Sequence, residues 1–160
     1  MIAQLMENRG TLIAHDVEPG RLRLISENCT RLGATCVQAA SPAEIEALVP
    51  ATQFDRILVD APCSNSGVIR RRVELRWRIQ PSEIDRLRDV QLQLLRQAAA
   101  LLKPGGTLVY STCSLEPEEN DEVVGGFLAT VPGFTRVSER SLIPFNDGTD
   151  GTFVATLRKE

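Results

Sequence analysis

An apolar run of strand length, Phe54-Asp-Arg-Ile-Leu-Val-Asp60, ends in a carboxylate and leads into a long connection. On either side of it, apolar runs alternate with segments whose apolar residues recur every three to four positions, as on one face of a helix. This alternation is typical of βαβ units, and it predicts an α/β fold with a mostly parallel sheet. The expected strands are 11–16, 34–38, 54–60 and 107–111, and the expected helices are 19–32, 42–48, 82–102 and 118–128.

The boundaries of these elements carry recognisable signals. Gly33 should end the first long helix and Ser82 should cap the second, which Lys103-Pro-Gly-Gly106 should stop with a turn. Two further strands are expected at 134–137 and 152–157. We predict that these two form an antiparallel hairpin that closes the sheet.

Composition fits one globular domain over residues 1–160, with 42% hydrophobic and 24% charged residues. A net charge of −3 does not indicate a nucleic-acid binder, so any attraction to phosphate must be local. No run approaches the roughly 20 apolar residues of a membrane span, and the first ten residues lack the pattern of a signal peptide. We therefore expect a cytoplasmic protein without a membrane partner.

Four cysteines and one histidine limit the possible chemistry. Cys29, Cys36, Cys63 and Cys113 form no C-x-x-C pair, and His15 is the only histidine, so a zinc site is not expected. In a reducing cytoplasm these cysteines are free thiols. Cys29 lies on the apolar stripe of a predicted helix and Cys36 lies in a predicted strand, so both are expected to be core residues.

Chemically distinctive residues follow three of the predicted strands. Asp16 ends the first, Asp60 begins the segment that contains Cys63, and Ser111 begins the segment that contains Cys113. Each would by itself fit an ordinary strand-end turn. Ligands of open α/β sheets bind at the carboxyl ends of the strands, and three such segments in one chain favour a site at that edge.

Two cysteine segments carry a resemblance to a known family. Asp60-Ala-Pro-Cys-Ser64 and Ser111-Thr-Cys-Ser114, in this order and after strands, resemble the Sun family of RNA cytosine-5 methyltransferases. Further matching pieces are Arg31-Leu-Gly33, Gly67-Val-Ile-Arg70, Pro117-Glu-Glu-Asn120 and Asp150-Gly-Thr-Phe153. The resemblance covers nearly the whole chain. It implies a Rossmann-like methyltransferase fold that lacks the family's first strand and glycine-rich loop.

The resemblance also implies a reaction through a covalent intermediate. The family transfers a methyl group from S-adenosylmethionine to carbon 5 of cytosine in RNA, and the bacterial members that this chain resembles act on ribosomal RNA. Carbon 5 is a poor nucleophile until a thiolate adds to carbon 6. By this resemblance Cys113 attacks the ring and Cys63 assists release of the product. Asp60 contacts the base near N3 and also helps to bind the cofactor.

Other residues are expected to bind the cofactor and the RNA. By the resemblance, Asp16 hydrogen-bonds the ribose hydroxyls of the cofactor; the alternative is an acid that favours the start of the following helix. The arginines expected to contact RNA are Arg70, Arg71, Arg72 and Arg76. They belong to the only basic concentration in the chain, and the alternative is a solvated loop face. Trp77, next to Arg76, is expected in the core.

Two departures from the family concern the cofactor. Nothing in residues 1–160 matches the glycine-rich loop, and Ala39-Ala40 stands where the family has Gly-Asp at the adenine. We expect weakened cofactor binding and little or no independent activity, from a truncated chain or a misassigned start.

The missing strand would lie between the strands that end at Asp16 and Asp60. Those strands should pair directly or use another chain, so self-association through this gap is a candidate interaction.

The acidic residues within 116–122 could suggest a metal site, but a helix start is the simpler explanation and no metal is expected. Two alternative functions stay open. The first is a methyltransferase for another substrate, although those that act on amino groups have an aromatic residue at the position of Cys63. The second is a non-catalytic RNA-binding or interaction module that keeps the fold without the cofactor.

Overall fold

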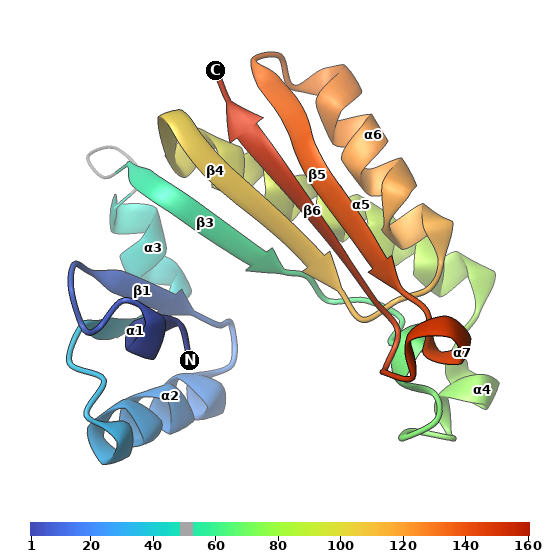
Figure 1. Ribbon diagram of the computed structural model, residues 1–160, viewed down its shortest axis with the longest axis horizontal. Helices are drawn as coiled ribbons and strands as arrows, with labels where there is room; N and C mark the ends of the chain where they lie inside the picture. The colour runs from blue at the N-terminus through green and yellow to red at the C-terminus, as the bar shows by residue number, and fades with distance from the viewer. Residues whose placement is uncertain (49–52) are drawn as a thin grey trace. The chain divides into compact units, whose positions relative to one another are not determined.

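The computed structural model describes residues 1–48 and 53–160. It divides into two compact units, Met1–Thr52 and Gln53–Glu160, and each is described by itself (Figure 1).

The first unit is a small βαβ arrangement. Its elements are α1 (Ile2–Leu5), β1 (Leu12–His15), α2 (Pro19–Leu32), β2 (Val37–Ala40) and α3 (Pro42–Leu48). β1 and β2 are parallel, with Leu12 opposite Val37. As predicted, α2 ends at Gly33, which adopts a left-handed φ of 64° that glycine tolerates without strain.

The second strand of this unit starts three residues later than predicted. The backbone N–H groups of Gly33 and Ala34 still donate to carbonyls of the last turn of α2. Residues 34–36 therefore belong to the helix exit, and β2 starts at Val37.

The second unit is a four-stranded mixed sheet with helices. Its elements are β3 (Phe54–Asp60), η1 (Ser66–Val68), α4 (Leu75–Arg78), α5 (Pro81–Leu101), β4 (Leu102–Thr112), η2 (Pro117–Glu119), α6 (Asp121–Thr130), β5 (Phe134–Leu142), α7 (Pro144–Asp147) and β6 (Thr152–Lys159). The strand order is β3-β4-β6-β5. β3 and β4 are parallel, whereas β6 is antiparallel to both of its neighbours. The predicted α/β fold with a C-terminal antiparallel hairpin is confirmed.

One hydrophobic core holds this second unit together. α5 and α6 lie on the same face of the sheet (Figure 1), and their apolar residues pack against the strands. Leu95, Leu108 and Phe127 are fully buried in this cluster. Tyr110 and Phe153 meet edge to face, with ring centroids 6.3 Å apart. Since this core fixes β3, β4 and β6, it also fixes the loops that follow β3 and β4.

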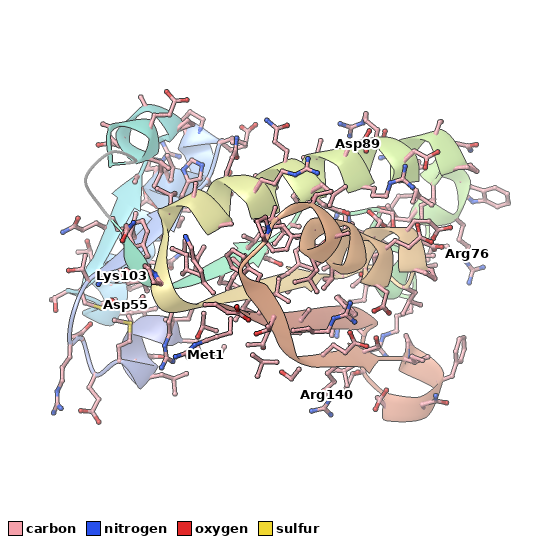
Figure 2. All side chains as sticks on the ribbon, turned by 90° about the horizontal axis from the view of Figure 1, so that it is seen from above. Met1, Asp55, Arg76, Asp89, Lys103 and Arg140 are labelled. Carbon is pink, nitrogen blue, oxygen red and sulfur yellow. The ribbon has the colours of Figure 1, made fainter. Side chains whose placement is uncertain are left out.

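The predicted cap of α5 is wrong, whereas its predicted end is confirmed. Ser82 does not cap the helix: Gln80 is the N-cap, and Pro81 occupies the first turn, where its missing N–H costs nothing. Lys103-Pro-Gly-Gly106 ends the helix as expected, but these residues form an irregular start of β4 rather than a separate turn. The ladder jumps there from the Phe54–Leu102 pair to the Arg56–Thr107 pair. An ion pair of 2.8 Å between Lys103 Nζ and Asp55 Oδ1 spans the irregularity (Figure 2).

The predicted helix at 118–128 begins later, because η2 and Asn120 come before α6. β1 and β3, which end next to Asp16 and at Asp60, belong to different compact units, and their direct pairing, or help from another chain, stays a prediction. Self-association at that gap stays a prediction.

None of the described helices is both long and apolar enough to cross a membrane.

Candidate active site

Two parallel strands bring the two cysteine segments together. Asp60 at the end of β3 is opposite Ser111 near the end of β4. Cys63 follows Asp60 by three residues and Cys113 follows Ser111 by two, so both lie just beyond the same sheet edge. Their sulfur atoms are 3.1 Å apart. Cys63 is 8% exposed and lies beneath the more accessible Cys113.

Asn65 contacts both cysteines. It has a left-handed φ of 61°, a region where asparagine is favoured over most other residues. Its side-chain Oδ1 accepts a hydrogen bond of 2.9 Å from the Cys113 thiol, and its Nδ2 donates to the Cys63 carbonyl at 2.8 Å. In this arrangement the Asn65 amide binds the protonated form of Cys113. Sequence reasoning missed this residue, although an asparagine right after the first cysteine segment was a possible signal.

The neighbouring thiol makes Cys113 more acidic. Cys63 can donate a hydrogen bond to the Cys113 sulfur, and this lowers the pKa of Cys113 to about 7. Partial burial and the charges of Asp60 and Glu119 act in the opposite direction. The same hydrogen bond, together with deeper burial, raises the pKa of Cys63. The pair therefore favours a thiolate at Cys113 over one at Cys63.

Asp60 has an exposed side chain at the end of β3, close enough for its charge to act on Cys113. Its Oδ1 accepts a hydrogen bond of 3.1 Å from Ser111 Oγ, a contact between the ends of neighbouring strands. A carboxylate has about four acceptor positions, so Asp60 keeps capacity for a ligand.

Two glycines hold three loops in close contact at this edge. The N–H of Gly67 donates to the Cys113 carbonyl at 3.0 Å, and the N–H of Gly151 donates to the Gly67 carbonyl at 2.8 Å. A Cβ on Gly67 would lie 2.8 Å from the Cys113 carbonyl oxygen, and one on Gly151 would lie 2.8 Å from the Cα of Gly67. Only glycine allows these backbones to approach so closely. The segments Gly67–Arg70 and Asp150–Phe153, noted in the sequence, thus support the cysteine loops.

The Pro117–Asn120 segment makes hydrogen bonds to the loop that contains Cys113. Asn120 accepts from Thr112 Oγ1 at 2.6 Å and donates to the Ser114 carbonyl at 3.0 Å. The Tyr110 hydroxyl donates to the Glu119 carbonyl at 2.6 Å. The Glu119 side chain is fully buried. Sequence reasoning placed this acid at a helix start and missed its buried role, because burial of one glutamate in an acidic run has no local signature.

The predicted RNA-binding arginines divide into two pairs. Arg70 Nε and Arg71 Nε bind the two carboxylate oxygens of Asp150 at 2.5 and 2.7 Å. Arg72 and Arg76 have no ion pair within the described part of the chain, and Arg76 lies on α4 with an exposed side chain (Figure 2). Half of the cluster therefore already neutralises an acid of the chain itself.

Trp77 corrects a sequence-based prediction. It was expected in the core, but it lies on the four-residue helix α4 and is 83% exposed. No residue of α4 is buried, so Trp77 lies outside the core together with the rest of this helix.

Asp16, in the first unit, directly follows β1. Its Oδ1 accepts from the Glu18 backbone N–H at 2.9 Å, and its Oδ2 is 3.2 Å from Arg21 Nη1. These contacts lower the pKa of Asp16. Asp16 lies two residues before the N-cap Glu18 and outside the first turn of α2, so both roles weighed from the sequence stay predictions. The remaining lone pairs of its carboxylate leave room for a ligand hydroxyl.

A family model described as 16S rRNA methyltransferase RsmB/F matches residues 1–158. The chain belongs to this family. A curated relative is the probable ribosomal RNA small subunit methyltransferase B of Bacillus subtilis, 39% identical over 99% of this chain and 40% of its own length. The chain thus spans about 40% of that relative.

Solved structures agree with the RsmB/F assignment. The structure of NSun6 from Pyrococcus horikoshii with SFG is 33% identical, with a TM-score of 0.87, over 99% of this chain and 44% of that one. A methyltransferase homolog from the same organism is 34% identical, with a TM-score of 0.86, over 99% of this chain and 56% of the other. The Rossmann-like methyltransferase fold predicted from the sequence is confirmed.

Proposed function

We propose that this RsmB/F chain carries the reacting residues of an enzyme that methylates carbon 5 of cytosine in RNA, with ribosomal RNA as the substrate. The contact between the Cys63 and Cys113 sulfur atoms, 3.1 Å apart at the carboxyl edge of parallel strands, is the main support. A pair of free thiols in which one sulfur is made acidic by the other suits covalent attack on a pyrimidine ring.

In this proposal Cys113 is the nucleophile. Its thiolate forms a bond to carbon 6 of cytosine, and the electrons of the 5,6 double bond make carbon 5 nucleophilic. Asp60, at the end of β3, would bind the base near N3 and stabilise the adduct. The base must leave any helical stack to meet Cys113, so a single-stranded or flipped cytosine is expected.

Product release requires two bonds to break. The carbon 5 proton leaves to a base, and the electrons of that bond restore the ring double bond and expel the Cys113 thiolate. We assign assistance in this release to Cys63, because its sulfur contacts the sulfur that leaves. Its raised pKa keeps a proton available beside Cys113.

S-adenosylmethionine would supply the methyl group when bound. Asp16 and Asp60 are suited to its hydroxyl and amino groups, because each is a strand-end carboxylate with acceptor positions left after its contacts within the chain. Each belongs to a different compact unit, and we assign each role separately. No segment of residues 1–160 matches the glycine-rich loop of the family, so we expect these residues by themselves to bind the cofactor weakly.

For RNA binding we propose the loop that contains Arg70, Arg71, Arg72 and Arg76. Arg72 and Arg76 are the stronger candidates, since the first two arginines bind Asp150. The exposed ring of Trp77 lies beside Arg76 in the sequence and could stack on an unpaired base.

Covalent trapping tests the proposal. RNA with 5-fluorocytosine at the target position cannot lose a proton from carbon 5, so the adduct should persist when S-adenosylmethionine is present. We expect a protein–RNA complex stable to denaturant with intact Cys113 and none with Cys113→Ala. Because these 160 residues should bind the cofactor weakly, the trapping is run with S-adenosylmethionine in large excess. Trapping that persists with Cys113→Ala would exclude this nucleophile.

A further inference from the structure

The buried Glu119 carboxylate binds the residue that follows each cysteine. Its Oε1 accepts from the Ser64 backbone N–H at 2.9 Å, and its Oε2 accepts from Ser64 Oγ at 2.5 Å. Its Oε2 also accepts from Ser114 Oγ at 2.6 Å. Ser64 follows Cys63 and Ser114 follows Cys113, so one side chain joins the two loops.

A third segment reaches the same carboxylate. Gln91, fully buried on α5, donates from Nε2 to Glu119 Oε1 at 3.1 Å and to the Pro62 carbonyl at 2.8 Å. Pro62 precedes Cys63 in the chain. Helix α5, the Cys63 loop and the Cys113 loop therefore meet at Glu119.

The contacts of Glu119 suit a carboxylate that only accepts hydrogen bonds. Four donor contacts are arranged around its two oxygens, two to each, which matches the acceptor capacity of an ionised carboxyl group. Burying a charge is costly even when it is well hydrogen-bonded, and packed apolar residues often stabilise a core at least as well. A contribution to stability therefore explains poorly why position 119 is a glutamate. A carboxylate that fixes the two cysteine loops relative to each other explains it better.

We propose that Glu119 is a positioning residue that holds the Cys63 and Cys113 sulfur atoms in contact. The inference extends the proposed function, and it relies on that function only for the use made of Cys113. Glu119 is not a catalytic residue in this scheme, because its oxygens bind the serines and not the thiols.

The test measures thiol geometry directly in the 160-residue chain with Glu119→Gln. A small disulfide oxidant forms a mixed disulfide with one thiol, and the second thiol displaces the reagent to form the Cys63–Cys113 bond. We expect this intramolecular step to slow at least tenfold in the variant, measured by quenching and mass spectrometry. The matched control is Glu122→Gln, which removes an exposed carboxylate from the first turn of α6 and should leave the rate unchanged.

The pH dependence of Cys113 alkylation separates positioning from a simple charge effect. The Glu119 charge by itself raises the pKa of Cys113, so loss of the charge alone would lower the alkylation midpoint. The hydrogen bond from Cys63 has the largest effect on the Cys113 pKa and lowers it, so loss of this bond would raise the alkylation midpoint. We expect the midpoint to rise in Glu119→Gln. A lower or unchanged midpoint with an unchanged cross-linking rate overturns the proposal.

A second variant keeps the test decisive if Glu119→Gln does not fold. Ser114→Ala removes the hydroxyl that binds Glu119, together with its contacts to Ser64 Oγ, Ser66 Oγ and the Glu116 backbone N–H. The carboxylate stays bound to Ser64 and Gln91. In a folded Ser114→Ala chain, judged by circular dichroism, slower cross-linking supports the proposal and an unchanged rate refutes it. None of these measurements uses RNA or a methyl donor. Failure of the proposed methyl transfer would therefore leave their outcome unaffected.

Discussion

The reactivity of Cys113 depends on two neighbours with opposite effects. Cys63 can donate to the Cys113 sulfur and favours its thiolate, whereas Asn65 Oδ1 accepts from the Cys113 thiol and favours its protonated form. Each neighbour can be removed separately, so the two effects lead to predictions of opposite sign.

Removal of the Cys63 thiol should make Cys113 less acidic. With a pKa of about 7, Cys113 should show an alkylation rate that rises through a midpoint near that pH. In Cys63→Ala the main stabiliser of the thiolate is lost, so the midpoint should move up towards the value of about 8.5 for an ordinary thiol. Mass spectrometry of the Cys113 peptide after timed iodoacetamide treatment measures this. Cys63→Ser, which keeps a hydroxyl donor, should fall in between, and an unmoved midpoint in Cys63→Ala would contradict the assignment.

Removal of the Asn65 amide should make Cys113 more acidic. Asn65→Gly keeps the left-handed backbone without strain and removes the acceptor that binds the thiol proton. The alkylation midpoint should therefore fall, with faster labelling below pH 7. Asn65→Ala removes the same amide but adds a side chain in a left-handed conformation, so it should be about 1 kcal/mol less stable than the glycine variant. A higher midpoint in both variants would show that Asn65 stabilises the thiolate instead.

At the scale of elements, the site depends on loops that touch through glycine. β3 and β4 bring the cysteine segments to the same edge, and the Gly67–Gly151 contact joins them to the loop before β6. The apolar core holds the strands, whereas backbone hydrogen bonds hold the loops beyond them. The loops lie so close together that there is no room for a Cβ atom at Gly67 or Gly151.

Gly67→Ala should separate these loops. The new Cβ would lie 2.7 Å from the Gly151 carbonyl carbon and 2.8 Å from the Cys113 carbonyl oxygen, so the backbone must shift. We expect a loss of about 2–3 kcal/mol in the free energy of unfolding, measured with urea. Gly125→Ala is the control, because it lies within α6 with open space around the new Cβ and should gain about 0.5–1 kcal/mol. Equal stability of the two variants would argue against a tight loop contact.

At the scale of the whole molecule, the two compact units differ in how much apolar surface they bury. In Met1–Thr52 the buried hydrophobic residues described are Ala3, Cys36 and Ala40, and α2 has no buried residue. The stripe of α2 predicted to pack in a core is therefore only partly covered. The unit Gln53–Glu160 contains the large cluster around Leu95, Tyr110 and Phe127 instead.

The first unit should therefore open more readily than the second. Backbone amides of β1 and α2 should exchange hydrogen for deuterium faster than those of β4 and α5, because less apolar burial opposes local opening. Hydrogen-exchange mass spectrometry at neutral pH compares the two within one sample. Equal exchange rates in the two units would show that apolar burial within the first unit is not what limits the opening of β1 and α2.

The elements were largely predictable because their signals are local. Alternating apolar runs predicted the six strands found within residues 1–48 and 53–160, and the helices 19–32 and 42–48 have the predicted bounds. Errors occurred where a neighbouring element decides the outcome. Residues 103–106 are enclosed in β4 between the Phe54–Leu102 and Arg56–Thr107 pairs with β3, and Trp77 lies on α4, none of whose residues is buried.

The sequence by itself determined the α/β class, the two cysteine segments and the family, since these depend on residue order and periodicity. Only the tertiary structure brought Glu119 under both cysteine loops, placed Asn65 against the Cys113 thiol and paired Arg70 with Asp150 across 80 residues. Such contacts join segments far apart in the chain. They arise from the strand order and the packing of α5 and α6, which no local pattern encodes.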